Sequence, residues 1–167
     1  VESDGGAIYL LNEAERRRIM GKALARLGDL IQAERYYREA LDLCDDATVA
    51  GEYGILLIAM NRAAEAKPYL AQGLGTDPDH DRVLAAMGLV LLSEGSHEEA
   101  FGYMKRALEA NYEHIGVMRP FLDLAVSLER LTEAEPIVRG FAEFYPGNLE
   151  LSCDYAELLS ALGRKRE

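Results

Sequence analysis

Residues 81–114, DRVLAAMGLVLLSEGSHEEAFGYMKRALEANYEH, hold the pattern that decides the fold. Apolar residues recur at helical spacing on both sides of Gly95, which readily adopts the positive φ of a helix end. Gly88 precedes this turn, while Ala100 and Ala107 follow it, and helices approach closely only where such small side chains meet. The stretch therefore predicts a pair of antiparallel helices joined by a tight turn.

The same pattern recurs along the chain with a period of 33 or 34 residues. Five columns of equivalent positions share this register: Ala33, Ala66, Ala100, Ala134; Ala40, Gly73, Ala107, Phe141; Gly21, Gly54, Gly88, Leu122, Ala156; Gly28, Asn61, Gly95, Glu129, Gly163; and Leu24, Leu57, Leu91, Ala125, Leu159. The columns predict one domain over residues 1–167, with helix pairs at about 14–46, 47–80, 81–114 and 115–148 and a terminal helix at 149–163. Asn12 and Glu15 resemble a helix start. Leu122 and Phe141 are bulky at small positions, so we expect the fourth pair to splay or to shift register.

This arrangement resembles the tetratricopeptide repeat family, whose unit of about 34 residues has the same order of small and large residues. Matching residues include Gly21, Gly28, Ala33, Tyr37 and Ala40, and the resemblance covers about residues 13–163. It implies an all-α fold, an α-solenoid of antiparallel helix pairs that forms a right-handed superhelix. It also implies that the first helix of each pair lines the concave surface. The large aromatic residue usual early in the first helix is absent.

Composition limits the classes of partner. The 167 residues include 18 basic and 29 acidic ones, a net charge of −11, which disfavours nucleic acid and anionic membranes. No apolar run reaches the roughly 18 residues of a membrane span, so we expect no membrane insertion. The two cysteines, Cys44 and Cys153, form no disulfide framework, and we expect a cytoplasmic location. The chain begins at Val1, and we expect a piece of a larger bacterial protein.

No set of residues has the spacing of a catalytic or cofactor site. His80, His97 and His114 are 17 residues apart, but this is half the repeat and places them in loops and turns. Residues 77–81, DPDHD, offer several ligand atoms but lack the glycine and distal glutamate of a calcium loop, so we interpret them as a solvated turn. We expect no enzyme activity, no catalytic residues, no metal and no cofactor.

The resemblance predicts a partner-binding groove on the first helices. Its candidate residues are Arg18, Lys22, Arg26, Glu52, Ile55, Ile58, Arg82, Leu89, Leu92, Arg119 and Asp123. Residues 14–40 have a net charge of +3, so the groove is expected to be basic at one end and apolar in its middle, which suits a peptide. The alternative is that the charges are solvated and the apolar residues pack on neighbouring helices. A carboxylate clamp of the kind that binds chaperone C-termini is rejected, because Glu52 and Ala86 stand where Asn and a basic residue are needed.

The leading functional hypothesis is a non-catalytic protein–protein interaction module that binds a protein or peptide through its concave face. The first alternative is a free-standing chaperone like those of type III secretion, which hold hydrophobic secreted proteins. The second is a repeat region attached to an enzyme such as a glycosyltransferase. An exposed terminal repeat could also support self-association.

Overall fold

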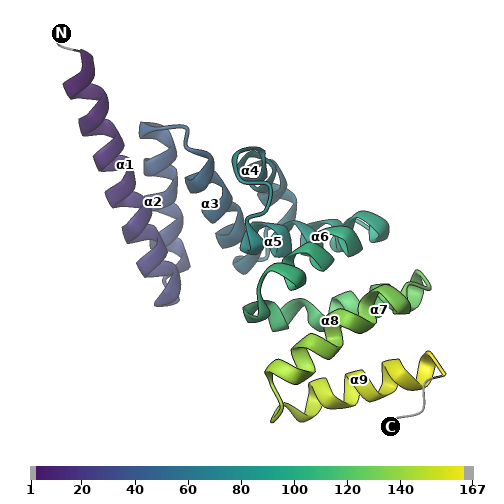
Figure 1. The fold of residues 1–167 in the computed structure, drawn as a ribbon. Helices are drawn as coiled ribbons and strands as arrows, with labels where there is room; N and C mark the ends of the chain where they lie inside the picture. Colours follow the sequence, from purple (N-terminus) through teal and green to yellow (C-terminus); the bar gives the residue numbers. More distant parts are fainter. Residues whose placement is uncertain (1–2, 164–167) are drawn as a thin grey trace.

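The computed structural model describes residues 3–163 and contains only helices over that range (Figure 1). The helices form successive antiparallel pairs, of which the first three are complete and regular. The bounds are α1 (Ser3–Arg26), α2 (Leu30–Leu43), α3 (Ala47–Ala59), α4 (Ala63–Thr76), α5 (Asp81–Ser93), α6 (His97–Ala110), η1 (Tyr112–Val117, a 3-10 helix), α7 (Met118–Ser127), α8 (Leu131–Phe144) and α9 (Leu149–Ala161). The predicted all-α solenoid is therefore confirmed.

The turn within each pair depends on one residue with positive φ. Gly28, Asn61, Gly95 and Glu129 have φ values of 84°, 60°, 78° and 58°, and these positions form one of the five sequence columns. A positive φ reverses the chain after the last turn of a helix and lets the next helix begin within two or three residues. The periodic glycines thus mark turns, as the spacing predicted.

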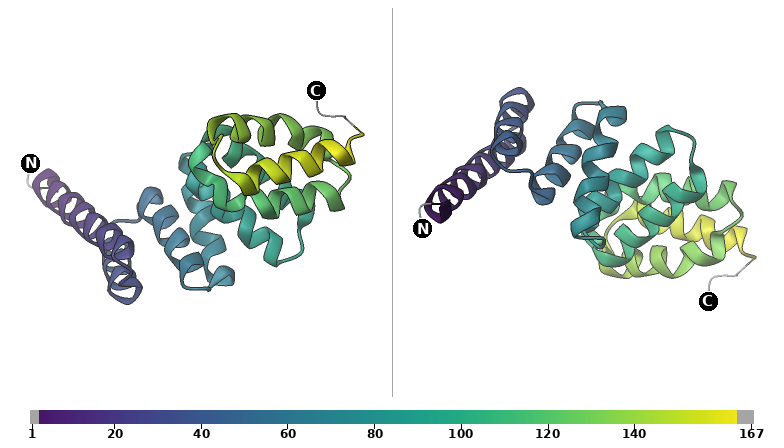
Figure 2. Two further views of the ribbon diagram at one scale, coloured as in Figure 1. Left: turned by 90° about the horizontal axis from the view of Figure 1, so that it is seen from below. Right: turned by 90° about the horizontal axis from the view of Figure 1, so that it is seen from above.

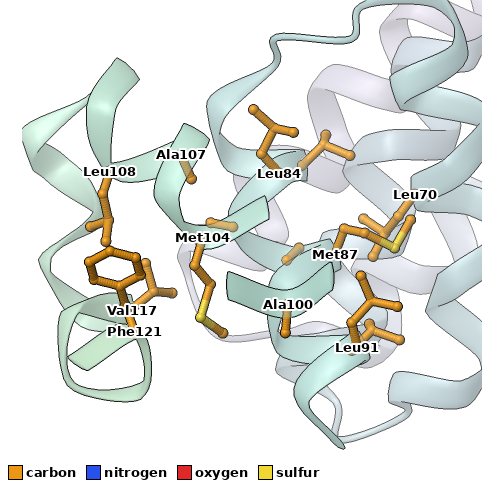
Figure 3. Close-up of a cluster of buried hydrophobic side chains, with 14 of the residues drawn as sticks. Leu70, Leu84, Met87, Leu91, Ala100, Met104, Ala107, Leu108, Val117 and Phe121 are labelled. Atoms are coloured by element: carbon orange, nitrogen blue, oxygen red, sulfur yellow. The ribbon is translucent and has the colours of Figure 1, made fainter. Parts of the chain in front are cut away.

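Small residues hold the two helices of a pair together. Ala33, Ala66, Ala100 and Ala134 are all completely buried. An added methyl group at Gly88 would lie 2.6 Å from Cγ of Met104, which shows how tightly the two helices cross. Around this crossing the larger side chains form a continuous apolar core that extends from one pair to the next (Figure 3).

Successive pairs stack into an elongated array with the two termini at opposite ends (Figure 2). Ion pairs between second helices link neighbouring pairs. Arg62, which precedes α4, lies 2.8 Å from Glu34 of α2, and Lys105 of α6 lies 3.1 Å from Glu133 of α8. The start of one second helix therefore lies beside the second helix of the preceding pair.

The two ends of the array differ from the regular middle. At the N-terminus, α1 begins at Ser3, so the prediction that the first helix starts near Asn12 is wrong. Asn12 lies inside a 24-residue helix, and the residues before it extend the helix beyond its partner α2 (Figure 1). The sequence signal failed because Asn and Glu three residues apart, which are typical of a helix start, also occur on the exposed side of a helix interior.

The fourth pair is less closely packed than the first three, which confirms the expected splaying. Its first helix, α7, has 10 residues, follows the 3-10 helix η1, and makes far fewer contacts with α8 than α5 makes with α6. Leu122 and Phe141 are both buried at the positions where glycine and alanine allow close approach elsewhere. Their bulk keeps the two helix axes apart.

Candidate functional site

A hollow of about 200 Å³ opens on the first helices of the first three pairs. We call it the N-terminal hollow, and its lining comes from α1, α2, α3 and α5. The lining residues are Lys22, Ala25, Arg26, Leu30, Tyr37, Glu52, Ile55, Leu56, Ala59 and Arg82. Five residues predicted for the groove therefore meet in one place: Lys22, Arg26, Glu52, Ile55 and Arg82.

Glu52 is a buried counter-ion at the base of this hollow. Its side chain is only 8% exposed, and Arg18 donates hydrogen bonds of 3.0 and 2.9 Å to its two carboxylate oxygens. Lys22 donates a third at 2.7 Å, and the hydroxyl of Tyr37 lies 3.5 Å away. Its negative charge is therefore compensated from α1, and it joins the first pair to the second.

The basic network alters the proton affinity of its members. The hydrogen bonds that Arg18 donates to Glu15, and then to Glu52, raise the pKa of Arg18 above its usual value. Burial, reinforced by the charge of Glu52, raises the pKa of Tyr37, whose phenol stays protonated at all physiological pH values. Tyr37 therefore contributes a neutral hydroxyl to the lining of the hollow.

Two of the cations in the hollow have no carboxylate partner. Every other lysine and arginine among residues 3–163 lies within 4.0 Å of a carboxylate oxygen, whereas Arg26 and Arg82 do not. These two residues come from different pairs, one from α1 and the other from α5, and both line the N-terminal hollow. Their donors are free to engage an anion.

An apolar wall lies beside these cations. Ile55 and Leu30 are half-buried and Leu56 is buried, all packed with the core, and Ala59 on the same helix as Ile55 is exposed. A ligand in the hollow would meet aliphatic carbon on one side and guanidinium groups on the other. Such a mixed lining suits a peptide side chain next to a carboxylate.

A second hollow, of about 230 Å³, lies toward the other end of the array. This C-terminal hollow is lined by Arg119, Leu122, Asp123, Val126, Leu131, Asp154, Glu157, Leu158 and Ala161. Arg119 is held 2.9 Å from Asp154 and 3.5 Å from Asp123. With one cation and three carboxylates it is net negative, so the two hollows have opposite charge.

The remaining predicted residues lie outside both hollows. Ile58, Leu89 and Leu92 are half-buried and pack against the core. The guanidinium group of Arg18 already donates hydrogen bonds to Glu15 and Glu52. A role for these residues in binding stays a prediction.

Some lining residues were missed from the sequence. Tyr37 and Asp154 are not among the predicted groove residues, yet each lines one of the two hollows. A signal for the charged network did exist: Arg18 and Glu52 are 34 residues apart, and Arg119 and Asp154 are 35 apart. Opposite charges separated by about one repeat indicate an ion pair between neighbouring first helices.

A histidine ties the 3-10 helix η1 to the start of α5. His114 lies 2.9 Å from Asp81, and the side-chain amide of Asn111 donates a 2.7 Å hydrogen bond to the same carboxylate oxygen. Burial raises the pKa of Asp81, but hydrogen bonds from Asn111 and His114 outweigh it, and the net effect is to lower that pKa. The contact therefore fastens the connection that follows α6 to the first residue of α5.

The repeat assignment is supported by comparison with known proteins. A model of the tetratricopeptide repeat matches residues 19–46 and again residues 81–114. Two of the helix pairs, the first and the third, therefore match the tetratricopeptide repeat. A comparison with curated proteins found no match.

Solved tetratricopeptide repeat structures share the fold at low sequence identity. MamA from Desulfovibrio magneticus RS-1 is 22% identical, with a TM-score of 0.66 over 83% of this chain and 78% of that one. PilF from Pseudomonas aeruginosa is 17% identical, with a TM-score of 0.71 over 90% and 69%. YrrB, a tetratricopeptide repeat protein with an unusual peptide-binding site, is 20% identical, with a TM-score of 0.70 over 90% and 78%. In residues 3–163 no helix is both long and apolar enough to cross a membrane.

Proposed function

We propose that this tetratricopeptide repeat chain is a non-catalytic interaction module that binds a segment of a partner protein in the N-terminal hollow. The segment carries a carboxylate next to an aliphatic side chain. The observation that supports this most strongly is the convergence of Arg26 and Arg82, the two cations without a carboxylate partner in the described chain, on one hollow with an apolar wall.

The charge of the hollow determines the sign of the ligand. The hollow has three positive charges, from Lys22, Arg26 and Arg82, and one negative charge, from Glu52. Glu52 already accepts hydrogen bonds from Arg18 and Lys22. The repulsion expected between Glu52 and an acidic ligand is therefore screened by cations that stand next to it. An arginine can also hold a carboxylate through two parallel hydrogen bonds, which a lysine cannot do.

The size of the available interactions suits a modest affinity. A hydrogen bond to a charged group contributes about 1.5–3 kcal/mol, and full burial of an aliphatic side chain about 1.5–3 kcal/mol. Two of each total about 6–12 kcal/mol, a range that includes the roughly 8 kcal/mol of micromolar binding, before association and ordering costs are subtracted. Micromolar or weaker binding is the range that we expect.

The cellular setting is also part of the proposal. Cys44 and Cys153 are both free thiols, which fits a cytoplasmic module, and the module would act within a larger bacterial protein. A chaperone for hydrophobic secreted proteins is the other function that a concave apolar wall would serve. The ligand distinguishes the two, because such a chaperone would not require a carboxylate.

Selection of short random peptides displayed on phage against the 167-residue chain tests the proposal. We expect the recovered peptides to be enriched in Asp or Glu next to Leu, Ile or Val. A fluorescent synthetic copy of one such peptide should bind in a polarisation assay, and the Arg26→Ala/Arg82→Ala variant should bind it at least about tenfold more weakly.

A matched control keeps the total charge the same. Arg35 and Arg139 are exposed cations outside the hollow, so Arg35→Ala/Arg139→Ala should retain the affinity of the wild type. Equal loss in both double variants would indicate a general charge effect and contradict the proposed site. Enrichment of purely apolar peptides would favour the chaperone instead.

A further inference from the structure

One face of α1 is exposed from Ile8 to the end of the helix although it is largely apolar. Its residues recur at helical spacing on the side away from α2. We call this set the α1 stripe: Ile8, Tyr9, Asn12, Arg16, Ile19, Met20, Ala23 and Leu27, the last of which directly follows the helix. All eight are exposed, with Tyr9 at 66% and Ile19 at 55%.

The equivalent faces of later first helices are covered by the preceding pair. In α3, one repeat further on, the counterparts of Ile19 and Met20 are Glu52 and Tyr53, and both are buried. Glu52 binds Arg18 and Lys22 of α1, while the hydroxyl of Tyr53 contacts Glu34 and Arg38 of α2. The α1 stripe therefore has the position of a surface that receives another helix.

The same holds for α5. Met87, which follows Met20 and Tyr53 in this series, is buried, and so is Val83, the counterpart of Arg16. An added methyl group at Gly51 of α3 would lie 3.1 Å from Val83, and Met87 lies beside Leu70 of α4 (Figure 3). Among the regular pairs, the first alone has this face open in the described structure.

The α1 stripe also accounts for much of the exposed apolar surface. Of the twelve large apolar side chains that are exposed in the described residues, eight lie between positions 8 and 31, and five of these belong to the stripe. Monomeric proteins rarely leave so continuous an apolar patch uncovered. The stripe runs from Ile8 to Leu27, about 30 Å of helix at 1.5 Å per residue, so two antiparallel copies would be in contact over most of the length of α1.

We propose that the α1 stripe binds the α1 stripe of a second copy of this chain, with the two helices antiparallel. In this arrangement a two-fold axis passes near residue 14, so Ile8 meets Met20, and Tyr9 meets Ile19. Arg16, the one charged member of the stripe, then faces Asn12 of the second copy rather than another arginine. The same patch serves both copies, as a closed dimer requires.

The distribution of charge opposes a contact through α1 less than a contact through the acidic remainder of the chain. The chain has a net charge of −11, which keeps copies apart at most of their surface. Helix α1 differs, because it contains five basic and three acidic residues. Two copies that approach through α1 therefore avoid the acidic remainder of both molecules.

Sedimentation equilibrium of the full 167-residue chain tests the proposal. The wild type should be a dimer at tens of micromolar, and Ile19→Asp/Met20→Asp should raise the dimer dissociation constant by about thirtyfold or more. Ile31→Asp provides the matched control, because Ile31 is 76% exposed on α2 and lies outside the stripe. Circular dichroism should show unchanged helix content in each variant.

Disulfide cross-linking tests the antiparallel arrangement. In a background with Cys44→Ser and Cys153→Ser, a mixture of Asn12→Cys and Arg16→Cys chains should form a cross-linked dimer on mild oxidation. Either chain alone should cross-link much less. A monomeric wild type, a dimer that survives Ile19→Asp/Met20→Asp, or a mixture that cross-links no better than its components would each overturn the proposal.

Discussion

Replacement of Gly73 by alanine tests the packing between helices most sharply. A methyl group at this position of α4 would lie 2.9 Å from Cα and 3.3 Å from N of Gly51, and 3.4 Å from the carbonyl oxygen of Ala47. All three atoms are backbone atoms of α3, so no side chain can rotate away. Alanine gains about 0.8–1 kcal/mol over glycine in a helix, but overpacking costs about 1–3 kcal/mol, and because only backbone atoms oppose the methyl group we expect a net loss toward the upper end of about 0–2 kcal/mol.

Thermal unfolding followed by circular dichroism at 222 nm measures the effect. For a chain of this size each kcal/mol corresponds to about 2–4 °C, so Gly73→Ala should lower the midpoint by several degrees. Gly75→Ala, in the same helix, places its methyl group where no atom lies within 4 Å, and should leave the midpoint unchanged or slightly higher. A Gly73→Ala chain as stable as the Gly75→Ala chain would refute the close contact between α3 and α4.

Three further changes test other parts of the structure. Gly88→Leu drives a side chain into Met104, 2.6 Å from the first added carbon, and urea denaturation should show a loss of several kcal/mol. Glu52→Gln leaves the cations of α1 facing a neutral amide, and the same assay should show a loss of about 1–3 kcal/mol. Hydrogen bonds from Arg130, and then from a lysine of α6, lower the pKa of Glu133 from 4.5 to about 2. A lowered folded-state pKa stabilises the fold above pH 4.5, and this contribution is lost as the pH falls toward 2, so Glu133→Gln should reduce the difference in melting temperature between pH 5 and pH 2.5.

The regular part of the fold could be predicted because each helix pair has the same packing and turn requirements. Close helix crossings require small residues, and tight turns require a residue that tolerates positive φ, so both leave a period in the sequence. Gly95 and Ala100 show this directly, since one has a φ of 78° and the other is completely buried. The bulky Leu122 and Phe141, at positions that are small in the first three pairs, correctly predicted the looser fourth pair.

The ends of the array and the charge pairing could not be predicted in the same way. Where α1 begins depends on residues that have no counterpart in later repeats, so periodicity gives no information about Ser3. Glu52 was expected to face a ligand, but it binds Arg18 and Lys22. A helical pattern fixes which face a side chain is on, whereas its ion partner depends on the tilt of the neighbouring helix.

A charge exchange between the hollow and its ligand tests the central claim most directly. A peptide recovered by selection is titrated calorimetrically into wild type and into Arg82→Glu, first with its native acidic residue and then with that residue changed to lysine. We expect Arg82→Glu to lose the native peptide and to bind the lysine peptide more tightly than the wild type does. If Arg82→Glu binds both peptides as the wild type does, the N-terminal hollow does not recognise a carboxylate through Arg82, and the proposed binding mode is wrong.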